Sequence, residues 1–410
     1  MTNAKVELSH SGFIKIFLLK YLPICSKRGA IMTTMTSREY IMHYGSIRSW
    51  AEIVADSVLA TYPDPKDLHN HHPGEWVYQN GFFVNALFAL WQKTGRQAYW
   101  NYLVKWVDLF INQAGEFDPT KYQQAAYNLD NILPGRLLLA LYRETGIEKY
   151  QTAAYALKTQ LDAQPRTSEG GYWHKLIYPS QMWLDGIYMA EVFSVEFAQT
   201  FNEPHYFDEA VHQITLIYQH TYDPRTGLLY HGWDETKTQV WAHRERGTSP
   251  EFWGRAIGWY IMALVDCLDW LPADHAGYDR LLSIFQHLAA SLTRYQHPEA
   301  VMWYQVLDKR ERPDNWPETS CTAMFAYAFA KGVRKGYLDP VFRSKAEQAY
   351  QRLIDHYVFF DQKGRFYLTD TVSVGSLRSN ADYEYYVTTE RRTNDFKGVA
   401  AFLYASLEFD

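Results

Sequence analysis

A repeated unit of two helices joined by a short polar turn runs through most of this 410-residue chain. It is clearest over residues 87–106, 137–157 and 330–350, where an apolar helix ends in a polar turn and an aromatic residue opens the next helix. In the first two units the turn contains Gly, the residue best suited to the left-handed conformation just past a helix end. Self-similarity of this kind is typical of stacked helical hairpins.

Apolar residues at helical spacing predict twelve helices, near residues 38–61, 80–93, 97–114, 130–144, 148–162, 181–200, 205–221, 250–270, 277–295, 318–334, 340–357 and 394–408. The helix at 148–162 carries a single apolar stripe, whereas the helix at 130–144 is apolar nearly all round. A helix with one stripe lies at the surface, and a helix that is apolar on every side is enclosed. Because the two kinds alternate, the sequence predicts an all-α (α/α)6 barrel, a toroid of six hairpins with an inner and an outer layer.

The loops between these helices differ in length. Connections that leave an inner helix are short, as at 94–96 and 145–147, whereas those that enter an inner helix are long, as at 222–249 and 358–393. All long loops then lie at one end of the barrel, where loops on a rigid scaffold usually carry function. The N-termini of the inner helices meet at the same end, and their free N–H groups favour an anionic ligand.

Composition narrows the class of protein. The net charge of −6 and the lack of a basic stripe argue against a nucleic-acid partner, and no apolar stretch approaches the length of a membrane span. The three cysteines lack metal-ligand spacing and indicate buried free thiols in a reducing, cytoplasmic compartment. The histidines at 69–72 lack the spacing of a ligand set as well, so we expect no metal.

The N-terminal residues 1–37 have no place in the repeat. They contain a short apolar stretch at 13–25 that is interrupted by lysines and lacks a clean cleavage site. We interpret 1–37 as a disordered leader or a misassigned start, with export through this stretch as the weaker alternative. Residues 38–410 are expected to form a single catalytic domain.

Two aspartates, Asp130 and Asp185, occupy matching places at the starts of two inner helices. Each could serve only as a helix cap or a first-turn acid. Their equivalent positions favour a shared pocket instead, and two carboxylates ringed by aromatic residues suit acid–base chemistry on a sugar. Trp183 and the apolar residues around Asp185 predict a raised pKa, which would keep that carboxyl protonated near neutral pH.

The long loops and the helix starts beside them supply the candidate substrate-binding residues. Aromatic side chains, 17% of the chain, either fill the core or stack on sugar rings. The candidates at the mouth are Asn80, His174, Trp183, His231, Trp253, Arg255 and Trp259. Arg255 is either a fork for a carboxylate or half of a structural ion pair with an acid on a neighbouring helix. Lys397, at the start of the last inner helix, is a weaker candidate.

Four ordered motifs carry a resemblance to a known family. They are HK-x-x-YP-x-QMWLDG-x-YMA at 174–190, SPEFWGRAIGWY-x-MALVD at 249–266, P-E-[ST]-S at 317–320 and ND-x-KG at 394–398. From about residue 40 to the end, the chain resembles glycoside hydrolase family 105, the unsaturated rhamnogalacturonyl hydrolases. Unsaturated glucuronyl hydrolases share the barrel but match these motifs less closely.

The resemblance implies an (α/α)6 barrel that acts on a 4,5-unsaturated uronic acid at the non-reducing end of a lyase-generated oligosaccharide. The family hydrates the C4=C5 vinyl ether, and its usual substrate is the unsaturated rhamnogalacturonan disaccharide. By motif matching, its principal acid/base falls on Asp185 and its second carboxylate on Asp130. His174, His231, Trp253, Arg255 and Trp259 fall on pocket positions. The resemblance implies no metal and no organic cofactor.

Other functions remain as alternatives. The chain could be an unsaturated glucuronyl hydrolase that acts on ulvan, arabinogalactan or glycosaminoglycan-type fragments. It could also be an ordinary acid–base glycosidase, a sugar epimerase or a non-catalytic sugar-binding toroid. The paired acids favour an enzyme, whereas the sequence indicates neither the second sugar nor the oligomeric state.

Overall fold

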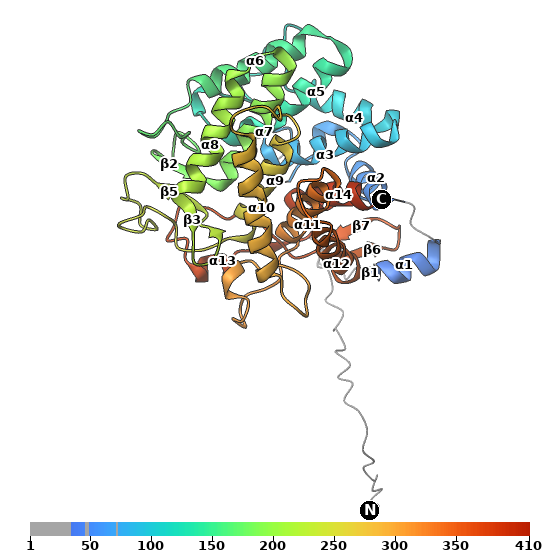
Figure 1. The fold of residues 1–410 in the computed structure, drawn as a ribbon. Helices are drawn as coiled ribbons and strands as arrows, with labels where there is room; N and C mark the ends of the chain where they lie inside the picture. Colours follow the sequence, from blue (N-terminus) through green and yellow to red (C-terminus); the bar gives the residue numbers. More distant parts are fainter. Residues whose placement is uncertain (1–33, 46–48, 71–72) are drawn as a thin grey trace, which may run out of the picture.

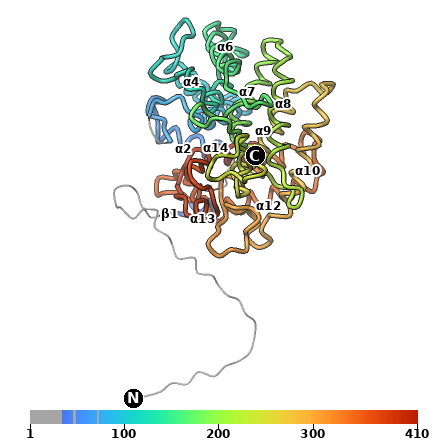
Figure 2. The backbone as a smooth tube through the Cα atoms, turned by 90° about the vertical axis from the view of Figure 1, so that its left-hand side faces the viewer, coloured from blue at the N-terminus to red at the C-terminus, as the bar shows by residue number. Residues whose placement is uncertain are grey.

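Two concentric layers of helices make up the protein in a computed structural model that describes residues 34–45, 49–70 and 73–410. The inner helices are α3 (Tyr78–Thr94), α5 (Arg136–Thr145), α7 (Leu184–Phe201), α9 (Gly254–Cys267), α11 (Thr319–Arg334) and α14 (Phe396–Phe409). The outer helices are α2 (Trp50–Thr61), α4 (Gln97–Val107), α6 (Glu148–Asp162), α8 (His205–Thr221), α10 (Tyr278–Tyr295) and α12 (Val341–His356). Figure 2 looks along the barrel, with outer helices around the rim.

The inner ring is closed. Each inner helix packs on the next in chain order, and α14 packs on both α11 and α3. Every residue of α9 is buried, whereas α6 buries one face only, as the apolar patterns predict. The six-hairpin toroid expected from the sequence is therefore confirmed.

Several predicted helix ends are wrong, and proline and glycine explain part of the difference. The helix predicted at 38–61 is two helices, because α1 (Ser37–Tyr44) ends at Gly45 in the left-handed region. Residues 129–135 form two 3₁₀ turns rather than the start of α5. Pro134 lies in the second of these turns, and its missing N–H suits a helix start rather than an interior.

Short antiparallel strands and the helix α13 (Tyr383–Thr388) lie in the long loops, except β1, which precedes α1. Strands of two or three residues are too short to show a period in the sequence. They are the sheet of β1 (Thr34–Thr36), β6 (Val358–Asp361) and β7 (Phe366–Leu368), and the pairs β2 (Gln181–Trp183) with β5 (Gly232–Asp234), β3 (Tyr222–Asp223) with β4 (Leu228–Leu229), and β8 (Thr371–Val372) with β9 (Arg391–Arg392). Strand β2 replaces the first residues of the helix predicted at 181–200.

Residues 34–37, which precede the domain boundary predicted at residue 38, have regular structure. Strand β1 pairs with β6, and Thr36 caps α1. Residues 1–33, with Cys25, lie outside the described residues, and so do His71 and His72. Cys267 and Cys321 are buried free thiols, as expected.

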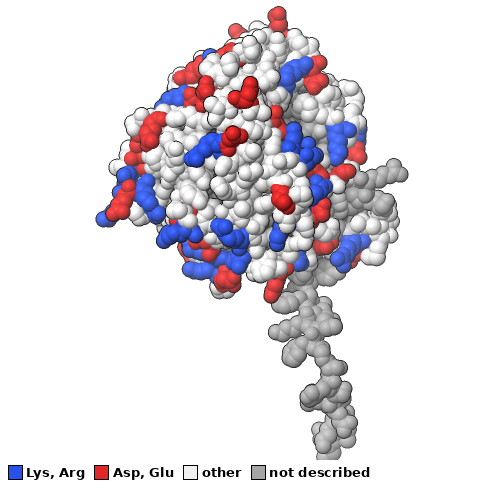
Figure 3. All heavy atoms as spheres, viewed as in Figure 1, with Lys and Arg blue, Asp and Glu red and all other residues white. Residues whose placement is uncertain are grey.

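Several of the long loops gather at one end of the barrel, whereas β6 and β7 of the connection 358–393 lie beside β1 and α1 at the right of Figure 1. Strands β2, β3 and β5 and helix α13 lie together at the left of Figure 1, the side that faces the viewer in Figure 2. Acidic and basic side chains are interspersed over the face in Figure 3. None of the helices in the described part of the chain has both the length and the apolarity to cross a bilayer. Nor does any group of three or more His, Cys, Asp or Glu residues in that part form a candidate metal site.

Candidate active site

Backbone pairing brings Asp130 beside the loop residues His174 and Lys175. Asn128 forms a bridge with Lys175, and the N–H of Leu129 donates to the carbonyl of His174 at 3.2 Å. These contacts set one Asp130 oxygen 3.5 Å from His174 Nε2 and bring the other into contact with the Lys175 ammonium. One carboxylate therefore lies between an imidazole and a cation at the mouth of the barrel.

A second pairing places Asp185. Strand residue Trp183 pairs with Gly232, and the N–H of Leu184 donates to the carbonyl of His231 at 2.9 Å. Asp185 follows in the first turn of α7, where its Oδ2 lies 3.0 Å from His231 Nε2. The Asp185 side chain is 16% exposed, whereas that of His231 is fully buried. The Asp185 carboxylate therefore faces the pocket and contacts the His231 imidazole, which is fixed in place.

His174 lies between the two carboxylates. Its ring stacks on Trp183 at 4.5 Å between centroids, and Trp183 stacks in turn on Tyr178 at 4.6 Å. Burial lowers the pKa of His174 to about 4, and the opposing effects of Asp130 and Asp185 are too weak to restore it. His174 is therefore neutral at pH 7 and offers a hydrogen-bond donor or acceptor rather than a charge.

The raised pKa predicted for Asp185 is not found in the protein without substrate. Burial does raise the pKa of this carboxyl, but the neighbouring His231, with a smaller contribution from His174, outweighs burial and leaves the pKa below its usual value. The prediction was wrong because the sequence does not show that β2 and β5 bring His231 into contact with Asp185. The free site therefore holds a carboxylate with an adjacent imidazole.

The guanidinium of Arg255 binds groups of the protein itself. Its guanidinium contacts Glu318 at 3.4 Å and donates to Ser320 Oγ at 2.8 Å. It also donates to the carbonyls of Ser373, at 3.0 Å, and Val372. Of the two alternatives left open by the sequence, the structure shows the ion pair with an acid beside a neighbouring helix. Arg255 anchors residues 372–373, which pass over the mouth.

Trp253, at the N-cap of α9, and Trp259, within α9, both lie deeper than expected. Trp253 is covered by Gly375, because a Cβ at that position would come within 2.4 Å of the indole ring. Trp259 packs edge-on against Phe82 at 4.8 Å and beside Tyr188 at 5.2 Å. Trp259 lies more than one turn inside α9, so it belongs to the floor of the barrel rather than to its mouth.

Asn80 and Lys397 are also committed to internal contacts. The Asn80 side chain accepts from the N–H of Asn70 at 3.1 Å and donates to the carbonyl of Glu75 at 3.3 Å, which anchors the preceding loop. Lys397 lies fully buried with its ammonium 2.6 Å from Asp395 Oδ1. Burial lowers the pKa of Lys397 to about 8, although Asp395 opposes the shift.

Some residues of the site are absent from the sequence-based prediction. Tyr78, the first residue of α3, is only half-buried, and its phenol is close enough to feel the charges of Asp130 and Asp185. Lys175 and Tyr178 are part of the HK-x-x-YP motif and could have been chosen from it. The hydroxyl of Tyr386 on α13 contacts His231, and no motif points to it.

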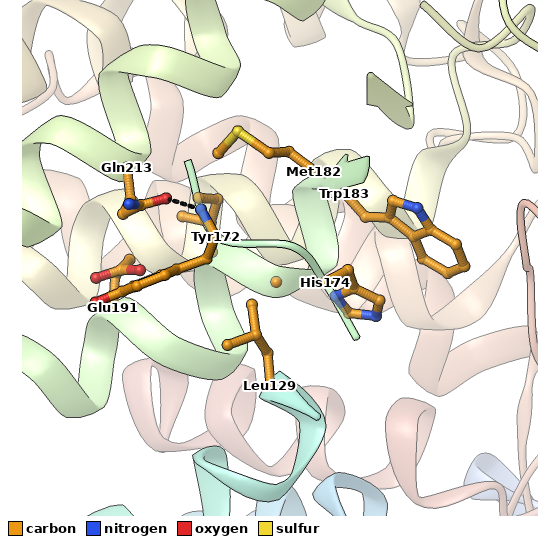
Figure 4. Close-up of a pocket in the computed structure, with 9 residues that line it drawn as sticks. Leu129, Tyr172, His174, Met182, Trp183, Glu191 and Gln213 are labelled. Atoms are coloured by element: carbon orange, nitrogen blue, oxygen red, sulfur yellow. Dashed lines mark hydrogen bonds between the residues drawn. The ribbon is translucent and has the colours of Figure 1, made fainter. Parts of the chain in front are cut away.

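A small cavity of about 10 Å³, room for one water molecule, lies behind His174 (Figure 4). Figure 4 shows Leu129 between His174 on one side and Glu191 and Tyr172 on the other. Glu191 is buried, one of its oxygens has no hydrogen-bond partner, and burial raises its pKa well above the usual range. The folded protein therefore keeps Glu191 neutral to a higher pH than the unfolded chain does.

Glu191→Gln is expected to stabilise the protein increasingly as the pH rises from 5 to 8. The native state keeps a proton on Glu191 that the unfolded chain releases above its normal pKa, so the wild type loses stability with rising pH. The uncharged amide removes this loss, which amounts to at most about 1.4 kcal/mol per pH unit. Urea unfolding at several pH values measures the effect. Glu148→Gln, at an exposed site on α6, serves as control, and parallel pH curves for Glu191→Gln and wild type would contradict the assignment.

Comparisons with known proteins agree with this architecture. The family model described as Glycosyl Hydrolase Family 88 matches residues 50–410. A glycoside hydrolase from family 105 of C. acetobutylicum ATCC 824 is 36% identical and superposes with a TM-score of 0.84, over 88% of this chain and 99% of that chain.

Two further relatives match part of the chain. Protein Atu3128 of Agrobacterium fabrum is 35% identical over 226 residues, which are 53% of this chain and 96% of the relative. Unsaturated rhamnogalacturonyl hydrolase YesR of Bacillus subtilis is 26% identical over 259 residues, 62% of this chain and 70% of the relative. Together with the closed ring and its paired carboxylates, these matches show that the chain is a glycosidase that belongs to glycoside hydrolase family 105, within the group described by the family 88 model.

Proposed function

We propose that the protein hydrates the C4=C5 double bond of a 4,5-unsaturated uronic acid at the non-reducing end of a short oligosaccharide and so releases the next sugar. The observation that carries this proposal is the contact between Asp185 and the buried His231 at the mouth of the barrel, 3.0 Å long. A carboxyl beside a fixed imidazole suits general acid–base catalysis. Asp130 and the neutral His174 lie on the other side of the same pocket.

Substrate binding supplies the protonated acid that the free site lacks. The carboxylate of the uronate brings a negative charge and displaces water from the pocket, and both effects favour the neutral form of Asp185. Asp185 then gives its proton to C4, and positive character develops at C5 and the ring oxygen. The attacking water adds to C5 and returns a proton to Asp185. The hemiketal opens, the uronate rearranges to a keto acid and the second sugar leaves.

The second sugar is proposed to be rhamnose. Two points support this choice: the family 105 motifs of the chain and its 26% identity to YesR, an unsaturated rhamnogalacturonyl hydrolase. Asp130 would orient the sugar together with Lys175, which contacts its carboxylate. We place the enzyme in the cytoplasm, where its buried free thiols Cys267 and Cys321 would remain reduced.

Incubation with a panel of unsaturated disaccharides tests the function. We expect loss of the ultraviolet absorbance of the conjugated alkene with the rhamnogalacturonan disaccharide, and slower loss with ulvan, arabinogalactan and glycosaminoglycan disaccharides. The saturated disaccharide of the same composition is the control. Release of sugar from that control, with the unsaturated substrates untouched, would indicate an ordinary glycosidase. Binding of the unsaturated substrates without turnover would indicate a non-catalytic toroid.

A further inference from the structure

The imidazole of His231 lies in an almost entirely aromatic enclosure. Its ring centroid is 4.8 Å from that of Trp253 and 5.5 Å from that of Trp183, and the side chain is fully buried. In such surroundings a ring nitrogen without a polar partner is costly. The groups that meet the two nitrogens therefore decide which tautomer and which charge the ring adopts.

Two groups meet those nitrogens. Nε2 lies 3.0 Å from Asp185 Oδ2 without an aligned hydrogen bond, and Nδ1 lies 2.7 Å from the hydroxyl of Tyr386. Tyr386 lies 155 residues further along the chain, on the short helix α13 of the loop that crosses the mouth. Its own side chain is fully buried, so this hydroxyl meets the imidazole within the protein rather than through bulk water.

Tyr386 is held in place by groups that do not touch the imidazole. Gln305 donates from Nε2 to the carbonyl of Tyr386 at 3.0 Å and accepts from Trp253 Nε1 at 3.1 Å. The phenol ring of Tyr386 stacks on Trp253 with centroids 5.5 Å apart. The buried side-chain amide of Gln305 thus positions both Tyr386 and Trp253, which flank His231.

We propose that Tyr386 is a positioning residue for the acid–base chemistry, because its hydroxyl donates to Nδ1 and so holds His231 as the Nε2–H tautomer, with that N–H on the side of Asp185. This inference rests on the proposed function of the site. A tyrosine hydroxyl can donate, and Nδ1 lies within hydrogen-bond distance of it at 2.7 Å. With Nε2–H next to Oδ2, the proton of the acid form of Asp185 is favoured on the other oxygen, Oδ1.

The protons balance over one turnover. In the acid form, Asp185 carries its proton on Oδ1, while Oδ2 faces Nε2–H of a neutral His231 whose Nδ1 accepts from Tyr386. Asp185 gives the Oδ1 proton to C4 of the alkene and becomes a carboxylate. The water that adds to C5 gives one proton to Oδ1, which restores the starting form. His231 and Tyr386 neither gain nor lose a proton, and the role of Tyr386 is to hold the Nε2–H tautomer, which stabilises the carboxylate form of Asp185.

The charges that act on Asp185, His231 and Tyr386 come from several elements. Asp185 on α7 and His174 in the preceding loop face His231. On the other side, Tyr385 and Glu251 lie near the Tyr386 hydroxyl, and burial raises the pKa of Tyr386 well above its usual value. Tyr386 therefore stays a neutral phenol over the whole range in which the enzyme can be assayed.

Tyr386→Phe removes the hydroxyl and keeps the ring that stacks on Trp253. We expect kcat for the unsaturated disaccharide to fall about 10- to 100-fold, because Nδ1 of His231 loses its hydrogen-bond donor and the ring is no longer held with Nε2–H on the side of Asp185. KM should stay within about threefold. The high-pH limb of the kcat profile, where Asp185 loses its proton, should move to higher pH by about one unit, because the carboxylate is less stabilised. Tyr383→Phe is the matched control, since it removes a hydroxyl from the same helix that donates to Asp314 at 2.8 Å, away from His231.

Nitrogen NMR of histidine-labelled protein tests the inference without substrate. The His231 signals are assigned from the His231→Gln variant. Tyr386→Phe should shift the Nδ1 signal of His231, whereas Tyr383→Phe should leave it unchanged. If the Nδ1 signal does not respond to loss of the hydroxyl, or if kcat falls with an unchanged pH profile, Tyr386 has only a structural role and the inference is overturned. Failure of the wild type on every unsaturated substrate, with the NMR shift present, would overturn the proposed function alone.

Discussion

Asp185→Asn should fold as the wild type does and lose turnover of the unsaturated substrate by about 100- to 10,000-fold, the range for loss of a general acid–base group. The amide has nearly the shape of the carboxyl, and it still meets His231 Nε2, which lies 3.0 Å from Oδ2 in the wild type. It can neither deliver a proton to C4 nor accept one from water. The loss should appear in kcat, while the dissociation constant for the disaccharide changes little.

Alkene absorbance gives the rate, and calorimetry with the inactive variant gives the affinity. Asp208→Asn is the matched control, because Asp208 contacts His275 Nε2 at 3.2 Å on the surface, as Asp185 contacts His231 in the pocket. The control should keep full activity. Turnover by Asp185→Asn within tenfold of the wild type would show that another group donates the proton, and Asp130 would be the next residue to replace.

The two layers of the barrel were predictable because helix burial leaves a direct trace in the sequence. An enclosed helix must be apolar on all sides, as α9 is, and an outer helix needs one stripe only, as in α6. Loop lengths then located the mouth without any knowledge of side-chain contacts. Strands β2 and β5 left no such trace, because each has only three residues.

The partners within the site were much less predictable than its location. Asp185 and His231 are brought together by the pairing of Trp183 with Gly232, a contact between segments about 50 residues apart. Periodicity carries no information on such pairing, so the effect of His231 on the Asp185 carboxyl could not be foreseen. Arg255 shows the same limit, since its type fits a ligand fork and an internal ion pair equally well.

A buried cluster of charges joins the inner helices below the pocket. Asp266 on α9 lies 2.7 Å from the Lys331 ammonium on α11 and accepts from the Tyr327 hydroxyl at 2.7 Å. Its other oxygen lies 3.6 Å from Arg136 on α5 and accepts from the Tyr188 hydroxyl on α7 at 3.3 Å. The cluster thus connects four neighbouring helices of the ring through one carboxylate.

Asp266→Ala is expected to lower the free energy of unfolding by about 1–3 kcal/mol, because it leaves the buried hydroxyls of Tyr327 and Tyr188 without their acceptor. Lys331 keeps Asp269 at 2.7 Å and Arg136 keeps Glu196, so neither cation is left unpaired. Burial raises the pKa of Asp266, but Lys331 and Arg136 outweigh it and leave the pKa below its usual value. The stabilisation is therefore present above the unfolded-state pKa of about 4 and is lost as the pH falls through the lower folded-state value.

Urea unfolding at pH 7 and at pH 3 measures this effect, and the gap between wild type and Asp266→Ala should narrow at the lower pH. Asp279→Asn, an exposed acid in the first turn of α10, is the control and should change stability by only a few tenths of a kcal/mol. Asp266 lies twelve residues after the start of α9 at Gly254, about 18 Å along the helix axis from the mouth. The folded fraction of the variant should therefore keep the wild-type KM, and an equal loss of stability in Asp279→Asn would show that the buried cluster has no special role in closing the ring.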